Sequence, residues 1–327
     1  MRVFAAFLVL HLTGCVYLLE KPRNESWKSE AQLAASRPSD SALVEPSQAE
    51  AQFPGAPAVT PPGQLKQVVD VDEIPALGVQ ERENAYAVVI GIEQYRERLP
   101  KADYSANDAR IMGEYLTKVL GYPEKNVVVR VNEKAAKADL EKYFGPWLRN
   151  NVDPGSSVFV FYSGHGAPNP KTGDAYLVPY DGDPTYVETT AYSLKRLYAD
   201  LASLPAKEVV VMVDSCFSGA GGRSVIAKGT KPVGISVEGS LRPWGKIKVL
   251  AASTGDQISL AYEEKGHGLF TYYVLRGLQE AKYRTPEGSL KLKELFEFVR
   301  PQVERVARKQ YNSEQTPQLM LPHGLQD

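Results

Sequence analysis

Cysteine is scarce in this sequence: only Cys15 and Cys216 occur among 327 residues. So few thiols exclude a disulfide framework and a cysteine zinc site. Neither sign of charge is in excess, because 38 basic and 39 acidic residues give a formal net charge of -1. Such a balance gives no electrostatic basis for binding nucleic acid. Long apolar runs are also lacking after the first residues of the chain, which argues against a later transmembrane helix.

The chain begins with MRVFAAFLVLHLTGC, in which a single basic residue precedes an apolar run. This pattern is typical of a secretory signal, which is too short to span a bilayer as a mature helix. Residues 12–15 (LTGC) resemble the lipobox of bacterial lipoproteins. The resemblance implies that Cys15 becomes the lipidated first residue of the mature chain, and Val16 in place of aspartate favours the outer membrane of the cell envelope. The alternative is an ordinary signal peptide that contains a cysteine.

Composition divides the chain into three parts. Residues 1–15 form the signal peptide with its lipobox. Residues 16–80 are rich in proline, alanine, serine and glutamate, so they bury too little apolar surface to offset the entropy lost on ordering. We expect this part to be an extended tether. Residues 81–327 carry periodic apolar patterns and are long enough for one well-buried domain.

Strand and helix patterns alternate through the third part. The apolar runs that predict buried strands cover residues 86–92, 126–131, 157–162, 208–213 and 247–252. The helical spacing of apolar residues covers residues 105–120, 138–149, 193–204, 269–281 and 292–309. Near-continuous Val/Ile strands that alternate with amphipathic helices indicate an α/β domain, in which a largely parallel sheet is covered by helices on both faces.

Two of the predicted strands end on chemically useful residues. The strand at 157–162 runs into Ser-Gly-His-Gly, which places His165 just past its carboxyl end; the strand at 208–213 runs into Asp-Ser-Cys, which places Cys216 past its own. Functional groups gather at this edge of a parallel sheet. If the strands are neighbours, the imidazole can take the proton of the thiol and leave a nucleophilic thiolate. Both residues also have structural alternatives. The cysteine would pack as a small hydrophobic residue, and the histidine would only stabilise the turn that contains it.

The glycines around the histidine fit the catalytic interpretation. Gly164 and Gly166 permit the backbone to turn sharply on both sides of the imidazole. The N–H groups of Gly166 and Cys216 would then form an oxyanion hole for a tetrahedral intermediate. A serine hydrolase is disfavoured, because the sequence has no Gly-x-Ser-x-Gly elbow.

The two motifs together carry a family resemblance. YSGHG at residues 162–166 and DSCFSG at residues 214–219 resemble the His and Cys motifs of caspase-like cysteine peptidases, above all those of metacaspases and their bacterial relatives. The resemblance extends over residues 86–320 and includes YAVVIGI, Asn-Asp-Ala at 107–109 and GHGLFT at 266–271. Phe217 departs from the histidine that is common after the metacaspase Cys triplet. Position 217 is not the nucleophile, so this departure bears on the subfamily rather than on the chemistry.

The resemblance implies a fold, a reaction and a specificity. The implied fold is a caspase-like three-layer sandwich with a mostly parallel six-stranded sheet. The implied activity is that of a cysteine endopeptidase, with His165 as general acid and base and Cys216 as the nucleophile that forms an acyl-enzyme. Metacaspase-like enzymes cut after Arg or Lys (the P1 residue), and the positions that match their acidic pocket are Asp108 and Asp214, with Ser105 and Ser163 as further lining.

Two of these assignments have structural alternatives. Ser105-x-x-Asp108 is also a capping-box pattern at the start of a helix, and the cap and the pocket do not exclude each other. The alternative for Asp214 is that its carboxylate only accepts hydrogen bonds from nearby backbone and does not line the pocket.

Other polar residues offer rival sites. His267 also lies between glycines, but it follows a polar loop rather than a strand, so we favour a structural role or a role in the substrate groove. Asp181 and Asp183 in PYDGDP offer a calcium site like that of some metacaspases, although two aspartates in a turn are more often only a turn. We predict no required metal and no cofactor. The expected partners are protein or peptide substrates and, through Cys15, a membrane.

The segment at 217–246 separates the strand of the nucleophile from the next strand. It is glycine-rich and has little periodicity, which is typical of a functional lid or a disordered segment. Arg223, Lys228 and Lys231 each satisfy the expected P1 preference. Self-cleavage at one of them and a lid that is never cut are both open.

Two further function classes compete with the peptidase. One is a catalytically silent caspase-like module used for binding, although the presence of both His165 and Cys216 argues against it. The other is a different thiol enzyme, such as an acyltransferase or amidase, because the same pair of residues activates thiols generally.

Overall fold

The computed structural model describes residues 70–75, 79–218, 225 and 245–322. They belong to a compact unit that runs from Gln64 to Asp327. None of the helices in these ranges is long and apolar enough to cross a bilayer. Cys15, most of the predicted tether, and the candidate cleavage residues Arg223, Lys228 and Lys231 lie outside the described residues.

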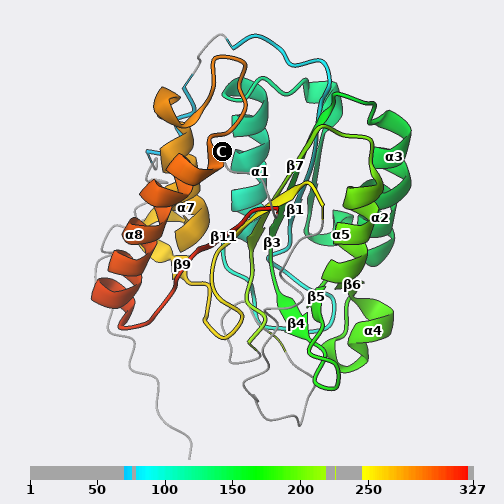
Figure 1. Cartoon of the computed structure of the whole chain (residues 1–327). Coiled ribbons are helices and arrows are strands. Elements are labelled where there is room, and N and C mark those ends of the chain that lie inside the picture. The colour runs from blue at the N-terminus through cyan, green and yellow to red at the C-terminus, as the bar shows by residue number, and fades with distance from the viewer. Residues whose placement is uncertain (1–69, 76–78, 219–224, 226–244, 323–327) are drawn as a thin grey trace, which may run out of the picture. The chain divides into compact units, whose positions relative to one another are not determined.

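A six-stranded sheet forms the centre of the unit, in the order β11-β8-β7-β3-β1-β2 (Figure 1). The parallel strands are β1 (Ala85–Gly91), β2 (Val127–Val131), β3 (Ser157–Ser163), β7 (Glu208–Asp214) and β8 (Ile247–Ala251). These are the five strands that the apolar runs predict. The sixth, β11 (Gln318–Met320), pairs antiparallel with β8, and the mostly parallel six-stranded sheet is confirmed.

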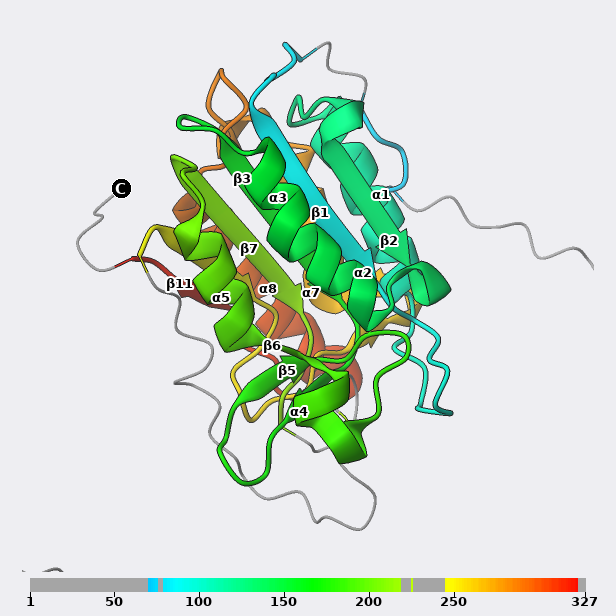
Figure 2. The same cartoon turned by 90° about the vertical axis from the view of Figure 1, so that its right-hand side faces the viewer.

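Helices cover both faces of the sheet (Figures 1 and 2). On one face lie α1 (Ser105–Lys118), α7 (Leu269–Leu278) and α8 (Leu292–Tyr311); on the other lie α2 (Lys137–Lys142), α3 (Leu148–Asn151) and α5 (Leu194–Ser203). The alternation of side chains along β3 explains the two cores. Phe159 and Phe161 pack into the cluster with α1, α7 and α8. Val158 and Val160 pack into the cluster on the opposite face.

The helix that the sequence predicts over 138–149 is interrupted. A π-helical turn at Tyr143–Trp147 separates α2 from α3 and contains Pro146. Proline has no backbone N–H, so the regular hydrogen-bond ladder lacks a bond at Pro146, and the backbone widens there into the π-helical turn. The prediction of one continuous helix is wrong for this reason.

Shorter elements follow the carboxyl ends of the central strands. A small sheet of β4 (Gly166–Pro168), β5 (Ala175–Leu177) and β6 (Tyr192–Ser193) lies beyond β3 and β7, beside α4 (Val187–Thr190) (Figure 2). A hairpin of β9 (Ala261–Tyr262) and β10 (His267–Gly268) precedes α7. Short 3-10 turns span Glu124–Asn126, Asn132–Lys134, Pro184–Tyr186, Glu263–Lys265 and Ala281–Tyr283. Periodicity does not identify such short pieces.

The domain also includes part of the chain before residue 81. Val71 is fully buried in the core cluster with α1 and α7. Its carbonyl oxygen accepts a hydrogen bond from the Tyr115 hydroxyl at 2.8 Å. Residues 70–74 therefore pack as part of the folded domain, ahead of the boundary that composition suggests.

Candidate active site

The register between β3 and β7 places the two motif turns side by side. Ser163 pairs with Asp214 at the ends of these strands, and the N–H of Gly164 donates to the carbonyl oxygen of Asp214 at 3.3 Å. His165 and Cys216 each lie two residues beyond this pair. A Cβ added to Gly166 would lie 2.4 Å from the carbonyl oxygen of Cys216. The turns that carry the imidazole and the thiol are thus in close contact at one edge of the sheet.

Three groups fix the position of His165. Its Nε2 lies 2.7 Å from the carbonyl oxygen of Pro100. A carbonyl oxygen can only accept, so Nε2 carries the hydrogen and Nδ1 is the basic nitrogen. The backbone N–H of His165 donates to the hydroxyl of Tyr95 at 2.6 Å, and the two rings lie 4.8 Å apart. The carbonyl oxygen of His165 accepts from the Tyr162 hydroxyl at 2.6 Å.

The thiol of Cys216 is buried against a segment that the sequence did not point to. Sγ accepts a hydrogen bond from the backbone N–H of Ser259 and lies 3.9 Å from the carbonyl oxygen of the same residue. Ser259 belongs to the stretch between β8 and β9, and only 2% of its surface is exposed. No motif or period in the sequence marks this serine.

Asp108 lies fully buried in the first turn of α1. Its Oδ2 accepts from the Ser163 hydroxyl at 3.1 Å, and its Oδ1 lies 2.8 Å from Nδ1 of His267. The backbone N–H of Gly268 lies 3.2 Å from both oxygens. Asp108 and Ser163, which the sequence assigns to one pocket, are therefore in direct contact.

Asp214 is equally buried, at the end of β7. Its Oδ1 accepts from the Ser259 hydroxyl at 2.5 Å and its Oδ2 from the Thr271 hydroxyl at 2.6 Å. Gly268 is the N-cap of α7 and Thr271 lies in its first turn. Both carboxylates thus contact the N-terminus of α7, where the helix dipole favours negative charge. Thr271 belongs to the GHGLFT motif, but the sequence alone predicts no role for its hydroxyl.

His267 lies between two carboxylates. Besides its contact with Asp108, its Nε2 lies 3.1 Å from Oδ1 of Asp72. Burial lowers the pKa of the imidazole, but the hydrogen bonds and charges of Asp108 and Asp72 outweigh that effect, so the pKa of His267 is raised. With both ring nitrogens bonded to carboxylates, His267 is poorly placed to act as the base for Cys216, which fits a structural role.

Ser105 is the first residue of α1 and not its cap. The N-cap is Tyr104, which has φ of 66° and makes no side-chain capping bond. The capping-box interpretation of Ser105 is therefore wrong. The buried Oγ of Ser105 has no hydrogen-bond partner among the described residues. It lies one helical turn before Asp108, on the same face of α1.

The two aspartates of PYDGDP both accept hydrogen bonds from backbone N–H groups, Asp181 from the start of α2 and Asp183 from its own turn. Oδ1 of Asp181 accepts from the backbone N–H of Lys137 at 2.8 Å. Oδ1 of Asp183 accepts from the N–H of Thr185 at 2.8 Å and caps the short 3-10 helix there. Within the described ranges, no group of three or more His, Cys, Asp or Glu residues is placed to hold a metal ion.

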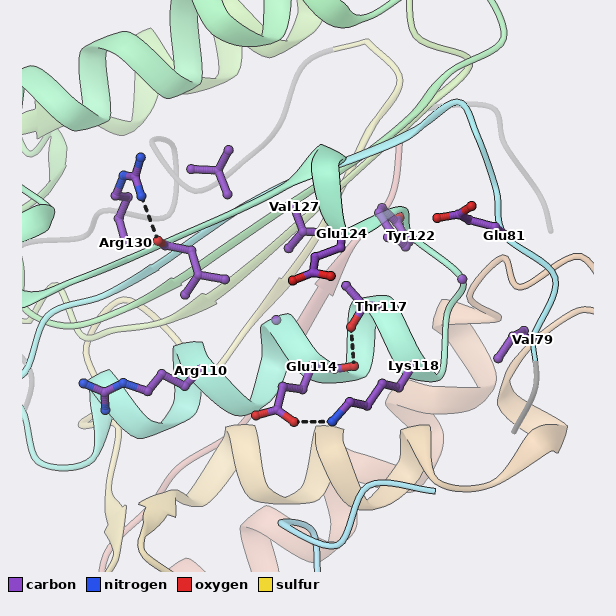
Figure 3. Close-up of a pocket in the computed structure, with 14 residues that line it drawn as sticks. Val79, Glu81, Arg110, Glu114, Thr117, Lys118, Tyr122, Glu124, Val127 and Arg130 are labelled. Atoms are coloured by element: carbon purple, nitrogen blue, oxygen red, sulfur yellow. Dashed lines mark hydrogen bonds and ion pairs between the residues drawn. The ribbon is translucent and has the colours of Figure 1, made fainter. Parts of the chain in front are cut away.

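A cavity of about 790 Å³ lies away from these residues, between α1 and the edge strand β2 (Figure 3). Its lining includes Arg110 from α1, Arg130 from β2, and the ion pair of Glu114 with Lys118 at 2.6 Å. Neither His165 nor Cys216 lines it. This cavity therefore lies apart from the two motif turns.

A family model and a curated relative both match this chain and agree on the family. The family model described as the caspase domain (peptidase C14) matches residues 84–323. Metacaspase-1A of Aspergillus oryzae is 30% identical over 90 residues, which cover 26% of this chain and 21% of that protein. The aligned region thus spans only about a fifth of the metacaspase.

Solved structures share the fold. Protein GSU0716 of Geobacter sulfurreducens superposes with a TM-score of 0.52 at 18% identity, covering 75% of this chain and 95% of that one. Caspase-1 of Spodoptera frugiperda superposes with a TM-score of 0.50 at 12% identity, covering 75% and 89%. At these identities the likeness establishes the caspase-like fold that the sequence predicts.

Proposed function

The chain belongs to the caspase-domain family of cysteine peptidases, and we propose that it is an active endopeptidase in which Cys216 is the nucleophile and His165 its general acid and base. The observation that carries this proposal is the register of β3 and β7, in which Ser163 pairs with Asp214. That register brings the turns of His165 and Cys216 into contact at the carboxyl edge of the sheet.

The proposed reaction follows the geometry of the imidazole. Because Nε2 of His165 donates to the carbonyl oxygen of Pro100, Nδ1 accepts the thiol proton as Sγ attacks the scissile carbonyl carbon. The N–H groups of Gly166 and Cys216 stabilise the oxyanion. The imidazolium then gives its proton to the leaving amine, and a thioester forms. Water, deprotonated by His165, attacks the thioester and releases the carboxylic acid and the thiol.

We propose Arg or Lys as the P1 residue, bound by Asp108 and Asp214. Two carboxylates at one edge of the sheet favour a cationic side chain and repel an acidic one. The buried hydroxyl of Ser105 supports this assignment, because it has no partner among the described residues and lies on the same helix face as Asp108. A guanidinium or ammonium group would supply the missing donor.

We also propose that the enzyme is held in the bacterial envelope by lipid on Cys15. Mass spectrometry of the native protein should find Cys15 as an acylated N-terminus, and Cys15→Ser should release the protein from membranes. A wild-type protein that is recovered unmodified and soluble would contradict the anchor.

We further propose self-cleavage in the segment at 217–246, which the proposed specificity would permit. Arg223, Lys228 and Lys231 are the candidate P1 residues. A new N-terminus after one of them should appear on incubation of the purified chain and be absent with Cys216→Ala. An active enzyme that stays intact would instead indicate a segment that is never cut.

The central test is turnover of fluorogenic peptides that differ only at P1, by the full chain in detergent. We expect hydrolysis after Arg and Lys, loss of activity in Cys216→Ala and His165→Ala, and full activity in Cys15→Ser, which removes the other cysteine. Activity that survives Cys216→Ala would overturn the mechanism, and a preference for Asp at P1 would overturn the pocket. Folded wild-type protein without any turnover would favour a binding module, and turnover of esters or amides but not peptides would favour another thiol enzyme.

A further inference from the structure

One residue, Ser259, contacts both the proposed nucleophile and a proposed specificity carboxylate. Its backbone N–H donates to Sγ of Cys216. Its side-chain hydroxyl donates to Oδ1 of Asp214 at 2.5 Å. Cys216 and Asp214 are each fully buried. A substrate therefore cannot reach the thiol or the carboxylate until some of the covering atoms move.

The two hydroxyl groups that bind Asp214 differ in how easily they can leave. Thr271 lies in the first turn of α7, a helix packed into the core. Ser259 lies in the stretch from Ala252 to Leu260, which contains no helix or strand. A segment without its own secondary structure opens at lower free energy than a packed helix. Ser259 is thus the donor that can be displaced while Thr271 stays on the carboxylate.

A cationic P1 side chain competes directly with the Ser259 hydroxyl. Guanidinium and ammonium groups are donors only, so they need an acceptor oxygen such as Oδ1 of Asp214. Ser259 is only 2% exposed, so its side chain must leave its position to admit another group. Because the N–H on Sγ belongs to the same residue, displacement of Ser259 from Asp214 also removes a hydrogen bond that packs the chain against the thiol.

We propose that Ser259 couples the two events, so that binding of a cationic P1 side chain at Asp214 withdraws Ser259 and uncovers Cys216. This inference rests on the proposed function, because it uses Asp214 as the P1 carboxylate and Cys216 as the nucleophile. Its consequence is a specificity step: a substrate without the cation leaves Ser259 in place, and the thiol stays covered. Binding energy of the correct side chain assembles the reactive site.

The C-terminal part of the domain holds Ser259 in its covering position. Gln315, which follows α8 and is 1% exposed, donates from Nε2 to the carbonyl oxygen of Ala252 at 3.1 Å and lies 3.4 Å from the Ser259 hydroxyl. Its Oε1 accepts from the N–H of Leu260 at 3.0 Å. One amide thus bridges both ends of the segment, and its removal should favour withdrawal of Ser259.

The test is the rate at which iodoacetamide alkylates Cys216 in the full chain with Cys15→Ser, where Cys216 is the only thiol. Arginine amide serves as the P1 probe, and norleucine amide, which lacks the charge, as its control. We expect saturating arginine amide to accelerate alkylation about tenfold or more, because the rate follows the uncovered fraction, and norleucine amide to have no effect. Calorimetry measures binding of arginine amide separately.

The outcomes test the coupling separately from the proposed P1 pocket on which it rests. If arginine amide binds but the alkylation rate is unchanged or falls, the coupling is wrong and the P1 pocket stands. An unchanged rate would mean that only the Ser259 hydroxyl rotates away from Asp214. Arginine amide that does not bind overturns the pocket and the coupling together. Peptidase activity is not needed for either result.

Variants give an independent readout. Ser259→Ala keeps the N–H but removes the hydroxyl that the cation must displace, so arginine amide should bind about tenfold more tightly, the equivalent of one hydrogen bond to a charged group. Ser253→Ala, in the same segment, removes a hydroxyl whose contact is with the carbonyl oxygen of Gln257 at 3.5 Å and should leave binding unchanged. Gln315→Ala should raise the alkylation rate without arginine amide. Weaker binding in Ser259→Ala, or an unchanged rate in Gln315→Ala, would contradict the proposal.

Discussion

The imidazole of His267 contacts Asp108 through Nδ1 at 2.8 Å, and both side chains are completely buried. Water does not screen the interaction between a buried imidazole and a carboxylate, so the carboxylate favours the protonated imidazole. His267 thereby determines the electrostatic surroundings of one of the two carboxylates that we assign to the P1 pocket.

This pair predicts how stability depends on pH. Although burial lowers the pKa of His267, Asp108 and Asp72 raise it more, so the folded pKa lies above the unfolded value. The stabilisation is complete below the unfolded pKa of about 6.5 and is lost as pH rises through the folded pKa. The difference in unfolding free energy between wild type and His267→Asn, measured by urea denaturation, should therefore shrink from pH 6 to pH 9. A difference that grows with pH would contradict the assignment.

A second prediction concerns Asp72, which lies before the part of the chain that the family model matches. Its carboxylate is 3.1 Å from Nε2 of His267. Asp72→Asn should lower the pKa of His267, because one of the two charges that favour the imidazolium is removed. Glu73→Gln is the matched control: it removes the same charge from an exposed neighbour. NMR titration of labelled histidine measures both, and equal shifts in the two variants would show that the Asp72 contact does not form.

The sequence predicted the parts of the site that depend on strand ends. Val/Ile runs gave the five parallel strands, and their last residues placed His165 and Cys216 at one edge. Contacts made by isolated residues from distant segments were not predictable. Asp72 reaches His267 across 195 positions and Ser259 reaches Asp214 across 45. Such contacts have no local period, because tertiary packing decides which polar groups meet.

The ends and interruptions of helices were predicted less well than the helices themselves. Ser105 fits a capping box by spacing, yet the helix begins after Tyr104, which has a left-handed backbone and makes no side-chain capping bond. Pro146 falls within a run of helical spacing, so the period alone does not show that the helix is interrupted there. Spacing predicts which elements exist more reliably than how they begin and end.

Tyr95 should act as a positioning residue for the imidazole. Its hydroxyl accepts from the backbone N–H of His165 at 2.6 Å, and its ring lies 4.8 Å from the imidazole. Tyr95→Phe keeps the ring contact and removes the acceptor, so kcat should fall about fivefold, the equivalent of one hydrogen bond of about 1 kcal/mol, while KM stays unchanged. Tyr186→Phe, at a side chain that is 65% exposed, is the control. A change in KM alone would assign Tyr95 to substrate binding instead.

The contact between the two motif turns depends on the absence of a side chain at Gly166. An added Cβ would lie 2.4 Å from the carbonyl oxygen of Cys216 and 2.6 Å from the ring of Phe217. Neither the backbone of Cys216 nor a buried ring can yield easily, so Gly166→Ala should push the two turns apart. We expect peptidase activity to be lost and the unfolding midpoint to fall, since overpacking of this kind costs about 1–3 kcal/mol.

The control is Gly145→Ala, because nothing lies within 4 Å of the Cβ that it adds. Thermal unfolding and peptide turnover measured on both variants separate the local clash from the general effect of replacing glycine. If Gly166→Ala retained both its activity and its unfolding midpoint, the turns of His165 and Cys216 would not lie as close as the register of β3 and β7 requires.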